Sequence, residues 1–180
     1  MHGEDMGQLF EDLEQLAEGL HLVERDAELL DRSRSEYAGV TFAARLHASV
    51  GEPITLTVVG VGALEGTLVR VGEGWCLLAT TLANQEWVVP LNAVTRTAGL
   101  SHLAVSAGAR RAVDRLPLRS ALREAAEARD EVVLFHLDGT HCRGRLARVG
   151  ADFVELVVTE NPPRPAYVVP LSMLAALRCG

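Results

Sequence analysis

The sequence predicts an α+β protein that is mainly β, with two small five-stranded barrels in tandem, a long N-terminal heptad helix and a connecting helix. Three observations support this prediction. One sequence unit occurs twice, each copy has the alternating apolar pattern of short antiparallel strands, and the N-terminal region has a regular heptad pattern. The expected division is a helix at 1–50, a first barrel at 51–98, a connector with a helix at 99–128 and a second barrel at 129–180.

The repeat is clearest in one seven-residue segment. Residues 66–72 read Gly-Thr-Leu-Val-Arg-Val-Gly, and residues 144–150 read Gly-Arg-Leu-Ala-Arg-Val-Gly. At the same offset Trp75 corresponds to Phe153, and after an insertion of two residues 87–91 (WVVPL) correspond to 167–171 (YVVPL). Shared glycine, arginine, aromatic and proline positions in one order indicate that the unit is duplicated.

Local signals within each copy are those of short antiparallel strands. Apolar residues alternate with threonines over residues 54–58, the pattern of a half-buried strand. Asp138-Gly139 predicts a tight hairpin in the second copy. Gly72 and Gly150 follow the second strand of each copy, and we expect a positive φ at both.

The N-terminal region has apolar residues at intervals that alternate between four and three, as in helices that pack side by side. We expect a helix from about Asp5 to about Ser49. Two arrangements are open: the helix folds back onto the barrels, or it pairs with a second copy. We predict the second, a coiled-coil homodimer or other homo-oligomer formed by Leu9, Leu13, Leu16, Leu20, Val23, Ala27 and Leu30.

Charge is distributed unevenly along the 180 residues, whose net charge is −7. Residues 1–36 hold 11 acidic and 3 basic residues, whereas residues 101–180 hold 9 acidic and 11 basic residues. An acidic segment repels nucleic acid and anionic membranes, so only the C-terminal half is suited to face an anion. All 17 basic residues are arginines, which excludes lysine Schiff-base chemistry and a phosphate-loop lysine.

The cysteines and the absence of targeting signals predict a cytoplasmic protein. Cys76, Cys142 and Cys179 are widely spaced and odd in number, without a CxxC motif, which indicates free thiols in a reducing compartment. The sequence has no signal peptide and no apolar run of the ~18 residues that a membrane helix needs. We expect no membrane association.

One polar cluster lies on the expected hairpin of the second copy: His136, Asp138, His141 and Cys142. Imidazole, carboxylate and thiolate groups suit zinc. The first copy has Val58, Gly60 and Leu64 at the aligned positions, and no second ligand pair follows. We therefore predict a polar hairpin, with no metal and no cofactor.

Arginines gather in the connector and recur at one strand position of each copy. One interpretation is a phosphate-contacting stripe; the other is a solvated surface in which arginines pair with the interspersed carboxylates. The possible anion or nucleic-acid contacts are Arg110, Arg111, Arg115, Arg119, Arg123, Arg70 and Arg148.

Residues 133–139 (VLFHLDG), with 144–146 (GRL) and 153–156 (FVEL), resemble the first motif of the Sm-like small β-barrels of the Hfq and LSm type. SH3-like barrels share these short features. The resemblance spans both repeats and implies a helix followed by five bent strands in each. That family forms an RNA-base pocket from an Asp and an Asn. The corresponding positions here are Gly72, Cys76, Gly150 and Val154, so no RNA-binding residue is implied.

These observations predict a non-enzymatic cytoplasmic adaptor that self-associates through its N-terminal helix and presents two Sm-like barrels to a protein partner. The alternative is a nucleic-acid-binding regulator that uses the arginine-rich connector and the barrel faces. A catalytic site is not expected, because the sequence has no nucleophile elbow, paired carboxylates or glycine-rich phosphate loop.

Overall fold

The computed structural model describes residues 34, 37–80, 85–109, 111–158 and 166–180. The chain divides into two units, Met1–Val40 and Thr41–Gly180. In the first unit the described residues end in a turn, where the Val40 amide donates a hydrogen bond of 3.0 Å to the Tyr37 carbonyl. The second unit contains all the strands considered below.

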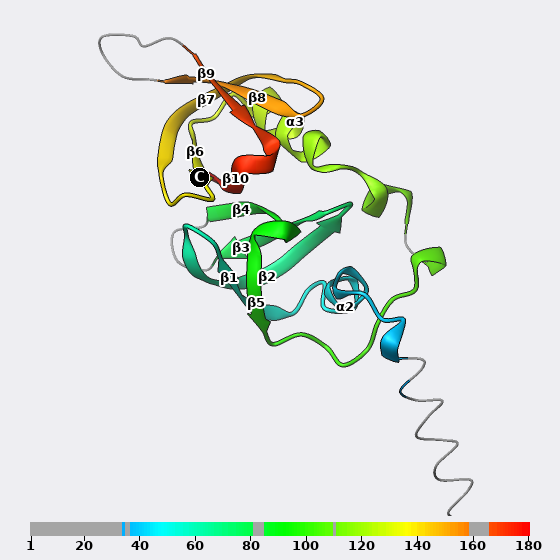
Figure 1. Ribbon diagram of the computed structural model, residues 1–180. Coiled ribbons are helices and arrows are strands. Elements are labelled where there is room, and N and C mark those ends of the chain that lie inside the picture. Colours follow the sequence, from blue (N-terminus) through cyan, green and yellow to red (C-terminus); the bar gives the residue numbers. More distant parts are fainter. Residues whose placement is uncertain (1–33, 35–36, 81–84, 110, 159–165) are drawn as a thin grey trace, which may run out of the picture. The chain divides into compact units, whose positions relative to one another are not determined.

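The described part of the second unit contains ten strands and two α-helices, connected in part by 3-10 helices (Figure 1). The helices are α2 (Phe42–Ala48) and α3 (Leu118–Ala128). The strands are β1 (Pro53–Val58), β2 (Gly62–Gly72), β3 (Trp75–Thr80), β4 (Gln85–Pro90), β5 (Val94–Ala98), β6 (Val132–His136), β7 (His141–Val149), β8 (Phe153–Val158), β9 (Tyr167–Pro170) and β10 (Leu174–Cys179). The 3-10 helices are η1 (Leu91–Ala93), η2 (Ala107–Ala109), η3 (Ala112–Arg115) and η4 (Leu171–Met173).

All ten strands form one antiparallel sheet in the order β5-β1-β2-β3-β4-β10-β6-β7-β8-β9. Each half therefore repeats one order, with its fifth strand beside its first. The halves join where β10 pairs with β4, placing Leu177 opposite Val88 and Arg178 opposite Trp87. We call this pairing the inner junction. The prediction of two separate barrels is wrong, because β4 pairs with the other half and so continues the sheet.

The predicted long helix to residue 50, and with it the coiled coil, is also wrong. The chain turns at Gly39, and α2 is a separate seven-residue helix. The Thr41 side chain accepts a hydrogen bond of 3.1 Å from the Ala44 amide, which caps the new helix at its N-terminus. The heptad positions 9–30 lie outside the described residues.

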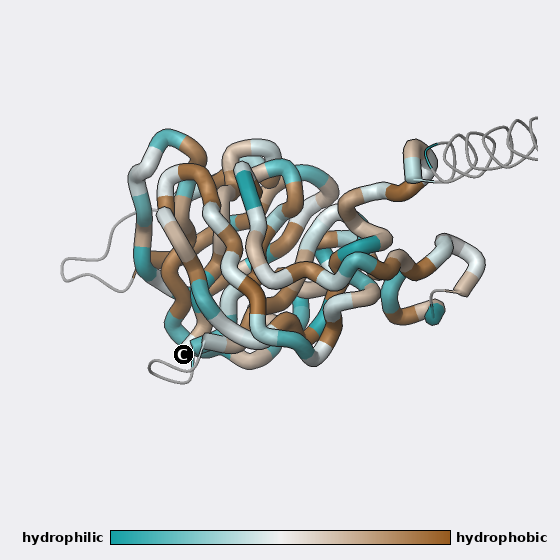
Figure 2. The backbone as a smooth tube through the Cα atoms, turned by 90° about the horizontal axis from the view of Figure 1, so that it is seen from below, coloured by the Kyte–Doolittle hydropathy of each residue, from teal (hydrophilic) through white to brown (hydrophobic). Residues whose placement is uncertain are grey.

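Two hydrophobic cores exchange residues across the inner junction. The first core is built mainly from β1–β5, yet it includes Ala175 and Ala176 of β10. The second core is built mainly from β6–β10 and α3, yet it includes Trp75 and Val88 of the first half. Hydrophobic segments accordingly run through the interior of the strand-rich unit (Figure 2). Each half therefore depends on the other to complete its core.

Helix α3 covers the second core. Ala121 and Leu122 are buried, and the helix begins at Leu118 after Pro117. The N-cap residue Pro117 makes no side-chain hydrogen bond to the helix. The connector before α3 is fixed to the first half by Trp75, whose Nε1 donates a hydrogen bond of 2.8 Å to the Leu116 carbonyl.

The repeated glycines are needed for close contacts. A β-carbon at Gly66 would collide with the Ala79 carbonyl, and one at Gly144 would collide with the Val157 carbonyl. The second strand of each half thus passes too close to the third for any side chain at this position.

Gly72 and Gly150 have a different role from the one expected. Neither has a positive φ, so that prediction is wrong. A β-carbon at Gly72 would collide with the Trp75 ring, and one at Gly150 would collide with the Phe153 ring. The aromatic side chain three residues later folds back over the glycine, which explains why glycine and aromatic residue recur together.

We predict that Gly144→Ala lowers the free energy of unfolding by about 1–3 kcal/mol, because the new methyl group overpacks against a backbone carbonyl. Urea unfolding followed by circular dichroism measures this change. Gly108→Ala is the matched control, since a β-carbon there meets no atom within 4 Å. Equal midpoints for the two variants would contradict the close approach of β7 to β8.

Candidate functional site

The described sheet ends at β5 on one side and at β9 on the other. Strand β9 is the counterpart of β4 in the repeat, with Tyr-Val-Val-Pro in place of Trp-Val-Val-Pro. In the inner junction β10 covers β4. The outer edge of β9 pairs with no other described strand.

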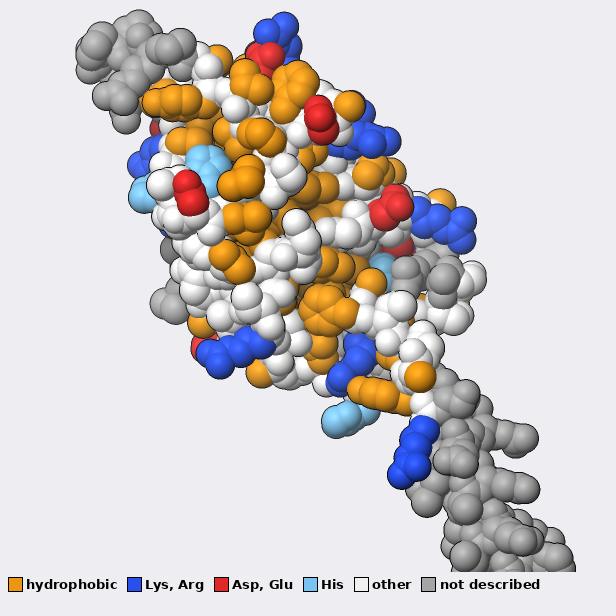
Figure 3. Space-filling model, in the orientation of Figure 1, with side chains coloured by type: hydrophobic (Ala, Val, Ile, Leu, Met, Phe, Trp, Pro, Cys, Tyr) orange, Lys and Arg blue, Asp and Glu red, His pale blue; other side chains and the backbone are white. Residues whose placement is uncertain are grey.

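Equivalent side chains on β4 and β9 differ sharply in exposure. The exposed fraction rises from 6 % at Trp87 to 41 % at Tyr167, from 5 % at Val88 to 62 % at Val168, and from 0 % at Ala93 to 43 % at Met173. Trp87, Val88 and Ala93 thus form a strip that is buried in the inner junction. The equivalent strip of the second half, formed by Tyr167, Val168 and Met173, is uncovered. Figure 3 shows hydrophobic side chains gathered over the half that contains β8, β9 and β10.

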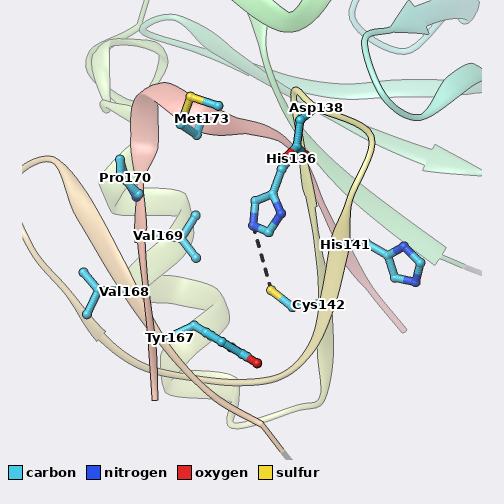
Figure 4. Close-up of a pocket in the computed structure, with 9 residues that line it drawn as sticks. All are labelled: His136, Asp138, His141, Cys142, Tyr167, Val168, Val169, Pro170 and Met173. Atoms are coloured by element: carbon cyan, nitrogen blue, oxygen red, sulfur yellow. Dashed lines mark hydrogen bonds between the residues drawn. The ribbon is translucent and has the colours of Figure 1, made fainter. Parts of the chain in front are cut away.

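A groove of about 430 Å³ lies beside this strip. The β6–β7 hairpin forms one wall with His136, Asp138 and Cys142, and strand β9 with η4 forms the other (Figure 4). We call it the β9 groove. The polar cluster that the sequence singled out thus borders an apolar strand edge.

A chain of hydrogen bonds orders the polar wall. The Thr140 hydroxyl donates to Asp138 Oδ1 at 2.6 Å, so its oxygen is left to accept from His136 Nδ1 at 2.9 Å. Nδ1 of His136 then carries a proton, and Nε2 faces Cys142 Sγ at 3.9 Å (Figure 4). The hairpin places an imidazole beside a thiol.

The ionisation of these groups argues against a nucleophilic site. Hydrogen bonds from the Thr140 hydroxyl and amide lower the pKa of Asp138, which stays ionised at neutral pH. Burial raises the pKa of the Cys142 thiol, which therefore stays protonated. Because the thiolate is the nucleophile, a raised pKa lowers the fraction of the reactive form near neutral pH.

The two histidines of the hairpin point in different directions (Figure 4). The His141 ring points away from His136 and Cys142 (Figure 4), and it stacks on Phe135 with 5.6 Å between the ring centroids. Among the described residues no three His, Cys, Asp or Glu side chains are grouped so as to hold a metal ion.

Several of the arginines singled out in the sequence form ion pairs. Arg70 Nη1 lies 3.3 Å from a Glu124 carboxylate oxygen, and Arg148 Nε lies 2.8 Å from one of Glu155. Arg111 pairs with Asp114 within η3. Arg115 is in η3, Arg119 is in α3, and Arg110 lies outside the described residues.

Two of these arginines nevertheless meet in space. Arg123 of α3 and Arg148 of β7 line a groove of about 640 Å³ together with Arg129, with Glu127 as its acidic member. We call it the α3–β7 groove. The sequence indicated Arg123 and Arg148 separately, and the packing of α3 on β7 brings them together.

Residues Val168, Val169 and Met173 of the β9 groove were not predicted as site residues. The sequence does carry a signal for them. The fourth strands share Val-Val-Pro, whereas the fifth strands differ, with Thr95-Arg96 in β5 where β10 has Ala175-Ala176. Among the described strands, only one of the two similar strips thus has an apolar partner strand.

Comparison with protein-family models, curated proteins and solved structures found no match to this chain. No helix among the described residues combines the length and the apolar character needed to cross a membrane.

We predict that Cys142 is alkylated by iodoacetamide more slowly than free cysteine near neutral pH. Its raised pKa delays thiolate formation, so the rate should still increase at pH values where free cysteine has reached its plateau. Mass spectrometry of the Cys142 peptide measures the rate, with Cys76 as the internal control because burial raises its pKa to about 12. Fast labelling that does not change between pH 6 and pH 8 would contradict this prediction.

Proposed function

We propose that this chain is a non-enzymatic cytoplasmic binding protein that takes an extended segment of a protein partner at β9 by strand addition. The observation that carries the proposal is the inner junction. There the same strip, on β4, is covered by an added antiparallel strand and becomes almost fully buried. The β9 groove presents the same surface to a partner.

Strand addition supplies both affinity and specificity. The outer edge of β9, which no other described strand covers, offers backbone amides and carbonyls that a second strand can pair with. The apolar side chains add hydrophobic stabilisation, and complete burial of a valine such as Val168 contributes about 1.5–3 kcal/mol. A partner segment would therefore be held by its backbone and selected by its side chains.

Two further observations support the proposal. Cys142 is protonated beside His136, which argues for a binding surface rather than a nucleophile. Cys76, Cys142 and Cys179 are all unpaired, as in a reducing compartment.

We predict that a phage-displayed library of random dodecapeptides yields binders to the full chain that are lost with Val168→Asp. An aspartate at this exposed edge position keeps the fold but places a charge inside the covered strip. Val157→Asp on the neighbouring β8 is the matched control, because Val157 is also exposed but lies one strand away from the edge.

The control variant should retain the binders. A library without any enriched sequence, or binders that ignore Val168→Asp and fail with Val157→Asp, would contradict binding at β9.

A second function, nucleic-acid binding, is favoured by the α3–β7 groove. Arg123, Arg129 and Arg148 line it beside a single carboxylate, Glu127, although the whole chain is acidic. Arg148 also pairs with Glu155, so Arg123 and Arg129 are the arginines of the groove best placed to meet a phosphate. Guanidinium groups recognise phosphate through paired hydrogen bonds. We propose this groove as the contact for a single-stranded nucleic acid.

We predict that Arg123→Glu weakens binding of a fluorescein-labelled oligoribonucleotide and reduces the steepness of its salt dependence. Each phosphate contact contributes a slope of about −0.7 in a plot of log K against log salt for single strands. Fluorescence anisotropy over a salt series measures both effects. Arg96→Glu on β5 is the charge-matched control, and equal slopes for the two variants would contradict the groove.

A further inference from the structure

We infer that the segment bound at β9 runs antiparallel to it and carries two consecutive small residues, then an apolar residue, then a basic residue. This inference rests on the proposed function and names the partner's chemistry. Its basis is the inner junction, which shows what a strand must provide to cover this strip.

Strand β10 provides side chains to both faces of the sheet. Ala175 and Ala176 are fully buried in the first core, whereas Leu177 is fully buried in the second core opposite Val88. A strand covering β9 meets the same two faces, with Val168 in the place of Val88. The apolar residue of the bound segment therefore lies opposite Val168.

The requirement for two small residues in the bound segment follows from the limited space beside the strip. In the first half the alanines pack over a surface that contains Ala93. Met173 takes the place of Ala93 in the second half, and it lines the β9 groove. The longer side chain leaves less room at that end, so large side chains are excluded there.

The requirement for a basic residue in the bound segment follows from the aromatic ring at the start of the strip. The Arg178 guanidinium carbon lies 5.6 Å from the Trp87 ring centroid and 5.8 Å from that of Phe135. Tyr167 takes the place of Trp87 and is largely uncovered. A cation opposite Tyr167 gains the same attraction to the face of a ring.

Strand β5 of a second copy does not have this chemistry. Its residues Val94-Thr95-Arg96-Thr97 stand where β10 has Leu-Ala-Ala-Leu, so it would place an arginine where the inner junction buries an alanine. The occupant is therefore a segment of a different protein.

The hairpin of the second half also disfavours a second copy at this edge. At the inner junction Gly60 lies so close to the opposite hairpin that a β-carbon there would collide with the His136 carbonyl. Asp138 is the counterpart of Gly60 at the outer edge. In a second copy placed in the same way, the negative charge of Asp138 would face the carbonyl of Val58, which disfavours an identical junction.

The test uses a fluorescein-labelled peptide with the sequence of residues 172–180 and Cys179→Ser, because this is the segment that covers β4 in the chain itself. Fluorescence anisotropy with the full chain measures its affinity. We expect binding that Val168→Asp abolishes and that Val157→Asp preserves. Peptides with Ala176→Trp or Leu177→Asp should bind at least tenfold more weakly.

The cation is tested by a double-mutant cycle. Tyr167→Ala in the chain and Arg178→Ala in the peptide should each weaken binding, and their combined effect should fall short of the product by about two- to tenfold. No coupling would overturn the placement of the cation opposite Tyr167.

The outcomes separate this inference from the proposed function. Library peptides that depend on Val168 but lack the small–small–apolar–basic order, together with no binding of the β10 peptide, would overturn the inference alone. Failure of both the library and the peptide would overturn strand addition itself. Sedimentation that shows self-association lost with Val168→Asp would identify a second copy as the occupant and overturn the inference.

Discussion

The pairing of β4 with β10 is the constraint on which the rest of the structure depends. A half of five short strands has too little interior to form a stable core of its own. Joining the halves edge to edge solves this, because β10 places Ala175 and Ala176 in one core while Trp75 and Val88 enter the other. The same join satisfies the backbone groups of two strand edges. Stability of either half is consequently tied to the presence of the other.

Duplication with this kind of join has an unavoidable geometric consequence. The join is between unlike edges, the fourth strand of one copy and the fifth strand of the next, so one edge of each kind remains at the ends. The two strands at these ends differ in polarity. Strand β5 has acquired polar residues suited to water, such as Thr95 and Arg96, whereas β9 keeps Val168 and Val169 of the buried pattern. An exposed apolar edge invites aggregation unless it is protected or used.

Much of the local structure follows from the sequence, and the join between the halves does not. The alternation at residues 54–58 and the Asp138-Gly139 hairpin predict strands because side-chain periodicity and turn chemistry act over a few residues. Whether β4 closes onto its own copy or continues into the next is decided by contacts distant in sequence. The prediction of a long helix was wrong for a local reason. The turn at Gly39 interrupts the helix, and the cap at Thr41 starts a new one. Only the polar wall of the candidate site was identified from the sequence. The apolar wall was not, because identifying it requires knowing which copy of the Val-Val-Pro strand is buried in the fold.

Asp138 is one residue that distinguishes the uncovered copy of the repeated surface from the covered copy. In the first copy Gly60 allows the hairpins of the two halves to approach until backbone meets backbone. Asp138 stands at the corresponding position at the outer edge, and hydrogen bonds from Thr140 favour the ionised form of its carboxylate. A lone strand does not bring a hairpin with it and so avoids this obstacle. On the proposed function, the groove would therefore favour a simple extended segment over a copy of the chain that carries a hairpin. Specificity here comes from excluding the wrong partner as much as from attracting the right one.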